Sequence, residues 1–276
     1  MDSITIAGQS ISYRVAGAGP TVILLHCSSS HSGQWKALIA DLASDFTVLA
    51  PDFHGYGHSD ALPRDGRPFF EHDSAIVTGL AARFGGRAHL VGHSLGGTIA
   101  LRVAIHHPEL VRGLSLIEPV QFSILAEMGD AERCEYFELV ATVDTLIRLK
   151  GVGDAARWFV DFWAGDGAFD ALDGKTQTYT EQTIGRVTDD SAGLSLRAPG
   201  QIRLADCRAL AMPCQIIRGG ATRASTRAIC AHLAREIPGV EVEDIPRVGH
   251  MAAAVQPGVV NPVIARFLRR VALDTG

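Results

Sequence analysis

Apolar and polar residues alternate near the start of the chain and then gather into short, continuous apolar runs. Alternation on either side of a turn at Gly8 predicts two strands with one exposed face each. Continuous runs such as "TVILLH" predict strands that are buried on both faces. The predicted strands span residues 2–7, 10–15, 21–26, 46–52, 88–92, 113–119, 213–220 and 240–245.

Segments with helical periodicity separate most of these strands. They predict helices over residues 32–43, 70–84, 94–107, 224–236 and 257–271. This alternation predicts an α/β fold with a doubly wound, mainly parallel, eight-stranded sheet. Residues 120–200 break the rhythm, because they show helical periodicity and many aromatics but no convincing strand. We therefore expect a helical cap at 120–200, inserted into a core formed by residues 1–119 and 201–276.

Composition and charge narrow the class of protein. Of 276 residues, 47% are hydrophobic and 20% charged, which is typical of a folded chain, and a net charge of −5 argues against nucleic-acid binding. No apolar stretch approaches the roughly 18 residues that span a membrane, and the N-terminus lacks the pattern of a secretion signal. Five scattered cysteines without a CxxC pair suggest neither a zinc site nor a disulfide framework. We expect a cytoplasmic protein with a small-molecule substrate and neither a nucleic-acid nor a membrane partner.

The segment "LVGHSLGG" places Ser94 between a predicted strand and a predicted helix. In a G-x-S-x-G motif, a sharp turn of this kind exposes the serine, and side chains at the flanking glycines would clash. The helix that follows points its free amides at any oxyanion that develops nearby. Ser94 is therefore the candidate nucleophile.

Four segments together carry a family resemblance: "LLH" (24–26), "DFHGYGHSD" (52–60), "GHSLGG" (92–97) and "GHM" (249–251). The chain resembles the α/β-hydrolase-fold proteins along nearly its whole length. That resemblance implies acyl transfer by hydrolysis, with no cofactor and no metal. Members of this family that catalyse haloalkane dehalogenation or epoxide opening carry aspartate at the position of Ser94. The serine here therefore argues against both reactions.

The resemblance also assigns a base and an oxyanion hole. His250 follows the last predicted strand, where the family carries its catalytic histidine, and the order of serine, acid and histidine fits. The backbone amide of Leu95 is the first expected oxyanion donor. The second comes from the loop after the third strand, where Cys27 stands in place of the usual glycine. Position there favours the Ser28 amide, with Cys27 as the other option. Cys27 does not lie at a sharp strand-to-helix turn like the one at Ser94, which argues against Cys27 as the nucleophile.

The position of the acid departs from the commonest pattern. The G-x-x-D frame after the seventh strand ends here in Thr222, which cannot ionise, and Arg218 and Arg223 flank it. Glu118 lies at the carboxyl end of the sixth strand, beside the nucleophile strand, and Pro119 is expected to keep it extended. Some members of the family place their acid after strand six. We therefore predict Glu118 as the acid, with three alternatives: Asp206, Asp244, or a dyad without an acid.

The leading hypothesis is a cofactor-free serine hydrolase that acts on a carboxylic ester, lactone or thioester of a small, largely apolar substrate. The aromatic residues of the cap favour such a substrate. A C–C bond hydrolase of a diketone uses the same triad, but would need an arginine clamp, for which Arg148 and Arg186 are candidates. A ligand-binding protein with a vestigial site is the third reading. The loop at Asp52 and His54 is interpreted as scaffold rather than as a metal site.

Overall fold

An eight-stranded sheet forms the centre of the computed structural model, which describes residues 1–127, 130–194 and 200–274. The strands follow the order β1-β2-β4-β3-β5-β6-β7-β8; the β1–β2 and β2–β4 pairs are antiparallel, and the others are parallel. They are β1 (Asp2–Ile6), β2 (Gln9–Ala16), β3 (Thr21–Leu25), β4 (Thr47–Pro51), β5 (Ala88–His93), β6 (Val111–Ile117), β7 (Cys214–Gly219) and β8 (Glu241–Ile245). The predicted fold class is confirmed.

Successive residues of the central strands enter two different hydrophobic cores. In β3, Val22 and Leu24 face one cluster while Ile23 and Leu25 face the other, as the two-residue period of a strand requires. Both faces are covered, which explains why the sequence shows continuous apolar runs instead of alternation.

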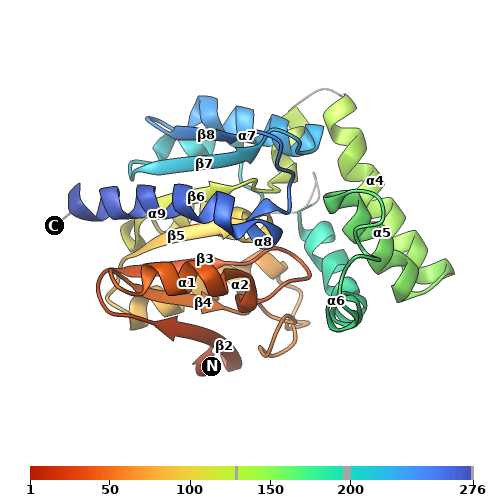
Figure 1. The fold of residues 1–276 in the computed structure, drawn as a ribbon, viewed down its shortest axis with the longest axis horizontal. Coiled ribbons are helices and arrows are strands. Elements are labelled where there is room, and N and C mark those ends of the chain that lie inside the picture. Colours follow the sequence, from red (N-terminus) through yellow and green to blue (C-terminus); the bar gives the residue numbers. More distant parts are fainter. Residues whose placement is uncertain (128–129, 195–199, 275–276) are drawn as a thin grey trace.

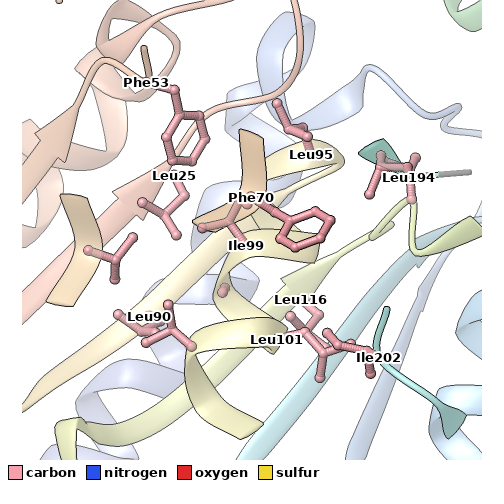
Figure 2. Packing of buried hydrophobic residues seen from close by; sticks show 14 of the residues in the cluster. Leu25, Phe53, Phe70, Leu90, Leu95, Ile99, Leu101, Leu116, Leu194 and Ile202 are labelled. Carbon is pink, nitrogen blue, oxygen red and sulfur yellow. The ribbon is translucent and has the colours of Figure 1, made fainter. Parts of the chain in front are cut away.

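Helices cover both faces of the sheet (Figure 1). On one face lie α1 (Lys36–Leu42), α8 (Ala252–Val255) and α9 (Pro257–Asp274); the other carries α2 (Phe69–Arg83), α3 (Leu95–His106) and α7 (Ala224–Glu236). Figure 2 shows Leu95, Ile99 and Leu101 of α3 packed among strand residues and Phe70. Four 3₁₀ segments complete the described elements: η1 (Ser32–Trp35), η2 (Pro108–Leu110), η3 (Phe122–Glu127) and η4 (Leu204–Ala209).

The segment between β6 and β7 is helical, as its periodicity predicts. It contains α4 (Asp130–Leu149), α5 (Val152–Ala164) and α6 (Gly174–Gly193), which lie together beside one end of the sheet (green in Figure 1). Residues 120–200 are called the helical insertion below. The division of the chain into a core and a cap stays a prediction. Within the described residues, no helix combines the length and apolarity that a membrane crossing needs.

Candidate active site

Ser94 sits at a strained turn between β5 and α3. Its φ of 55° is rare for a residue with a side chain, and its amide donates to the Ile117 carbonyl at 2.9 Å. A Cβ at Gly92 would come 2.2 Å from the Gly96 carbonyl oxygen, and one at Gly96 would come 2.2 Å from that of Leu25. Glycine is therefore required at both flanks, because the turn is packed backbone against backbone.

Three side chains from different parts of the chain meet in one hydrogen-bonded row. Ser94 Oγ lies 3.0 Å from His250 Nε2, and His250 Nδ1 lies 2.8 Å from Glu118 Oε2. The three residues are at most 5% exposed. A proton on His250 Nδ1, donated to Glu118, leaves Nε2 free to accept the serine proton. The structure thus brings together the predicted nucleophile, base and acid.

The backbone of Glu118 bends directly after the end of β6. The expectation that Pro119 keeps Glu118 extended is wrong, since Glu118 has a φ of 44° in the left-handed region. A following proline disfavours the right-handed helical region, and a left-handed φ avoids that region too. The conformation turns the chain out of the sheet while the carboxylate stays near His250.

Thr222 occupies the place of the usual acid and supports the carboxylate that replaces it. Its hydroxyl donates to Glu118 Oε2 at 2.6 Å, and the Gly219 amide donates to Oε1 at 2.6 Å. Burial opposes the ionisation of Glu118, but hydrogen bonds from His250, Thr222 and Gly219 outweigh it and lower the pKa of the carboxyl. A threonine hydroxyl can orient an acid, although it cannot replace one.

The two arginines beside Thr222 do not place their charge against His250. Arg218 pairs with Asp244 on the edge of the sheet. The Arg223 guanidinium lies over the Phe162 ring of α5, 3.6 Å from its centroid, and donates to the Phe162 carbonyl at 2.9 Å. The positive charges that flank Thr222 in the sequence are therefore paired elsewhere and do not oppose a cationic His250.

The two proposed sources of the second oxyanion donor differ in whether the amide is free. The Cys27 amide donates to Gln34 Oε1 at 3.1 Å. In the described part of the chain, neither the Ser28 nor the Leu95 amide has an acceptor, and Leu95 is the first residue of α3. Burial raises the pKa of the Cys27 thiol to about 12, which keeps the sulfur protonated.

His93, which the sequence suggests is a packing residue, links the loops around Ser94. Gln34 Nε2 lies 3.0 Å from His93 Nδ1, and His93 Nε2 lies 2.8 Å from the His250 carbonyl oxygen. Burial lowers the pKa of His93 to about 3, so the ring stays neutral and its Nε2–H donates to that carbonyl. Through Gln34 the same row reaches the Cys27 amide. Hydrogen bonds therefore tie together the loop of Cys27, the turn at Ser94 and the loop of His250.

A cavity of about 510 Å³ opens over Ser94 and His250. Most of its wall is apolar and comes from the helical insertion and its flanks. The apolar lining residues include Val120, Phe122, Leu139, Phe159, Val160, Trp163, Leu172, Val187 and Leu194. Cys27 and Ser28 line the side next to the nucleophile. The space suits a small substrate with a largely apolar body.

Asp190 of α6 adds a buried carboxylate to this wall. Its Oδ2 accepts from Tyr56 at 2.6 Å and from Ser28 Oγ at 3.1 Å, while Arg186 pairs with both Asp190 and Asp73. Burial raises the pKa of Asp190 to about 6, against the attraction of Arg186. The cluster fastens the helical insertion to the loop that carries Ser28. The sequence gives no local sign of it, because its members lie far apart in the chain.

The other candidates lie elsewhere. Asp206 accepts from the Arg203 amide at 2.8 Å, and Asp52 accepts from the amides of Ser32 and His58, which fits a scaffold role for its loop. His54 contacts Asp73, 3.0 Å away. Among the described residues, no group of three or more histidine, cysteine, aspartate or glutamate side chains is arranged to hold a metal ion.

Arg148 and Arg186, the proposed clamp for a diketone acid, do not line the cavity. Arg148 pairs with Asp144 on the exposed side of α4. Arg186 is buried, with its nitrogens bound to Asp73, Asp190 and the His54 carbonyl. Among the described lining residues there is no arginine or lysine.

Several known proteins resemble this chain. An uncharacterized protein from Mycobacterium tuberculosis is 37% identical over 113 residues, which are 41% of this chain and 33% of that protein, so this match spans about a third of the relative's length. The pimeloyl-[acyl-carrier protein] methyl ester esterase of Chromobacterium violaceum is 42% identical over 101 residues, 37% of each chain. The 2-(acetamidomethylene)succinate hydrolase of Mesorhizobium japonicum is 25% identical over 96% of this chain and 94% of the relative.

Solved structures show the same fold. The enol-lactonase from Burkholderia xenovorans LB400 has a TM-score of 0.78 and 19% identity, covering 97% of this chain and all of that one. A thermophilic esterase from Thermogutta terrifontis has a TM-score of 0.76 and 23% identity, over 99% of this chain and all of the esterase. The family model described as the alpha/beta hydrolase family matches residues 22–263. By that match the chain belongs to the alpha/beta hydrolase family.

Proposed function

We propose that this protein is a cofactor-free serine hydrolase of neutral carboxylic esters with a small, largely apolar body. The observation that carries the proposal is the row Ser94–His250–Glu118, hydrogen-bonded throughout at 3.0 and 2.8 Å and set in the wall of an apolar cavity. A vestigial site would not need such an intact row. The esterase named among the relatives adds support for an ester bond.

The chemistry follows from the geometry. His250 Nε2 takes the proton from Ser94 Oγ as Oγ bonds to the ester carbonyl carbon. The amides of Leu95 and Ser28 hold the oxyanion, and Glu118 stabilises the imidazolium. Collapse expels the alcohol, which takes the proton from His250. Water then gives its proton to His250, attacks the acyl group and releases the acid, after which the proton returns to Ser94.

The charge of the wall favours neutral substrates over carboxylates. Asp190 lines the cavity, its partner Arg186 is paired with two aspartates, and no arginine or lysine lines the wall within the described residues. A substrate carboxylate would lose its hydration without gaining a counter-ion. This argues against the C–C bond hydrolysis of diketone acids, which needs a cationic clamp.

A matched pair of substrates tests this proposal. p-Nitrophenyl hexanoate and mono-p-nitrophenyl adipate have acyl groups of equal length, and only the second ends in a carboxylate. We expect kcat/KM to be at least tenfold higher for the hexanoate, and enzymatic turnover of both to fall to the spontaneous rate in Ser94→Ala. Turnover above the spontaneous rate in Ser94→Ala, or a preference for the adipate, would refute the proposal.

A further inference from the structure

The imidazole of His250 has an aromatic ring of the helical insertion stacked on its face. The Trp163 ring of α5 lies with its centroid 4.1 Å from that of His250, at an interplanar angle of 29°. Trp163 also lines the cavity and is 9% exposed. Glu118 contacts the same imidazole at its edge, through Nδ1. The base is therefore held from two directions by two different parts of the chain.

Neighbouring residues fix the orientation of Trp163. Phe162 meets its ring edge-on, with centroids 5.0 Å apart and planes at 90°, and is itself stacked on Trp158 at 5.0 Å. Arg223, which follows Thr222 in the chain, lies over the Phe162 ring, 3.6 Å from its centroid. Because Thr222 contacts Glu118, the loop that supports the acid also supports the aromatic residues above the base.

The stacking matters because the charge of His250 changes during the reaction. The face of an aromatic ring carries negative electrostatic potential and attracts a cation, most strongly for tryptophan. His250 is neutral at rest in the proposed cycle and becomes an imidazolium when it takes the serine proton. A buried ring face interacts more favourably with that second form, which is the form present in the transition state.

We propose that Trp163 is a positioning residue that stabilises the His250 imidazolium through its ring face, and so links α5 of the helical insertion to the base. The proposal rests on the proposed function, because it needs His250 to act as the proton acceptor. It goes beyond a lining role: a residue that only shapes the cavity would affect substrate fit, whereas Trp163 acts on the charged state of the base.

A fluorinated tryptophan at position 163 separates the two roles. Multiple ring fluorines keep the shape of the indole and remove electron density from its face. The readout is the rate at which a small fluorophosphonate modifies Ser94, which requires no knowledge of the natural substrate. We expect a fall of about two- to thirty-fold, with kcat for p-nitrophenyl butyrate falling in parallel and KM nearly constant. The acidic limb of the pH–rate profile should move to lower pH.

The same substitution at Trp158 is the control, since that ring belongs to the same aromatic set without stacking on His250, and we expect no change there. Trp163→Phe should retain more activity than Trp163→Leu, following the order of ring-face potential. If wild type does not react with the probe, the proposed function fails and this inference falls with it. If wild type reacts and the fluorinated Trp163 protein reacts equally fast, the inference alone is overturned.

Discussion

Replacement of Glu118 by glutamine tests the triad, because all three groups around the carboxylate are donors. Gly219 N–H donates to Oε1, while Thr222 and His250 Nδ1 donate to Oε2. A glutamine offers one acceptor oxygen and one NH₂ group. If its oxygen stays with Gly219, the NH₂ faces His250 and donates to Nδ1. The histidine proton must then sit on Nε2, where it blocks acceptance from Ser94. If the amide is flipped, NH₂ and the Gly219 amide face each other across 2.6 Å.

Both orientations cost activity. Loss of the orienting carboxylate in a serine protease lowers turnover by about 10⁴, or roughly 5 kcal/mol, and we expect Glu118→Gln to lower kcat here by about 10³ to 10⁴. The assay is steady-state hydrolysis of p-nitrophenyl butyrate at pH 8. Glu243→Gln is the matched control, since Glu243 lies on the edge strand β8, where it pairs with the exposed Arg266, and the change should leave kcat within twofold.

Stability gives a second measurement on the same variant. Because the folded protein lowers the pKa of Glu118, its ionised form contributes stability above the unfolded value of 4.5, and that contribution is lost as the pH falls through the folded value. Urea unfolding should therefore show the largest difference between wild type and Glu118→Gln at neutral pH and a smaller one near pH 3. A folded variant with kcat within tenfold of wild type would refute Glu118 as the acid.

Three further outcomes are expected. Thr222→Val removes one donor to Glu118 and should lower kcat about five- to thirtyfold, as measured with p-nitrophenyl butyrate, while Thr222→Ser, which keeps the hydroxyl, stays close to wild type. Arg186→Leu removes the arginine that pairs with two buried carboxylates and should lower the free energy of unfolding in urea by about 3–5 kcal/mol. Arg64→Leu, whose ion pair is exposed, should lower it by at most about 1 kcal/mol. Equal losses would contradict a structural role for the buried cluster. Cys27→Ala should retain turnover. When the native protein is treated with iodoacetamide at pH 8, mass spectrometry should find Cys27 unmodified, because its thiol pKa is about 12. Rapid alkylation of Cys27 would show that its thiolate is accessible.

Local patterns predicted the sheet well, because apolar runs and glycine turns act over a few residues. All eight predicted strands overlap those of the structure, although the sixth begins at Val111, two residues before its predicted start. The predicted helix over 32–43 is a 3₁₀ turn followed by α1, and the short α8 after His250 was missed. Segments this short carry too few residues for a period to emerge.

What the sequence could not supply are contacts between distant residues. The position of Glu118 was inferred from its strand end, yet its support by Thr222 joins residues 104 positions apart, and its φ follows from that tertiary setting rather than from Pro119. The stacking of Trp163 on His250 was likewise invisible, since periodicity places Trp163 on a helix face without saying what the face meets. Those are the features that set the chemistry.

The hydrogen bond between Thr222 and Glu118 has a consequence for how this site can evolve. The Thr222 hydroxyl touches the same carboxylate oxygen that His250 contacts, so the ends of β6 and β7 converge on one point beside the base. A carboxylate on either strand end reaches that point, and the partner position then has only to donate a proton to it. The acid can therefore pass between neighbouring strands while the nucleophile, the base and the sheet stay where they are.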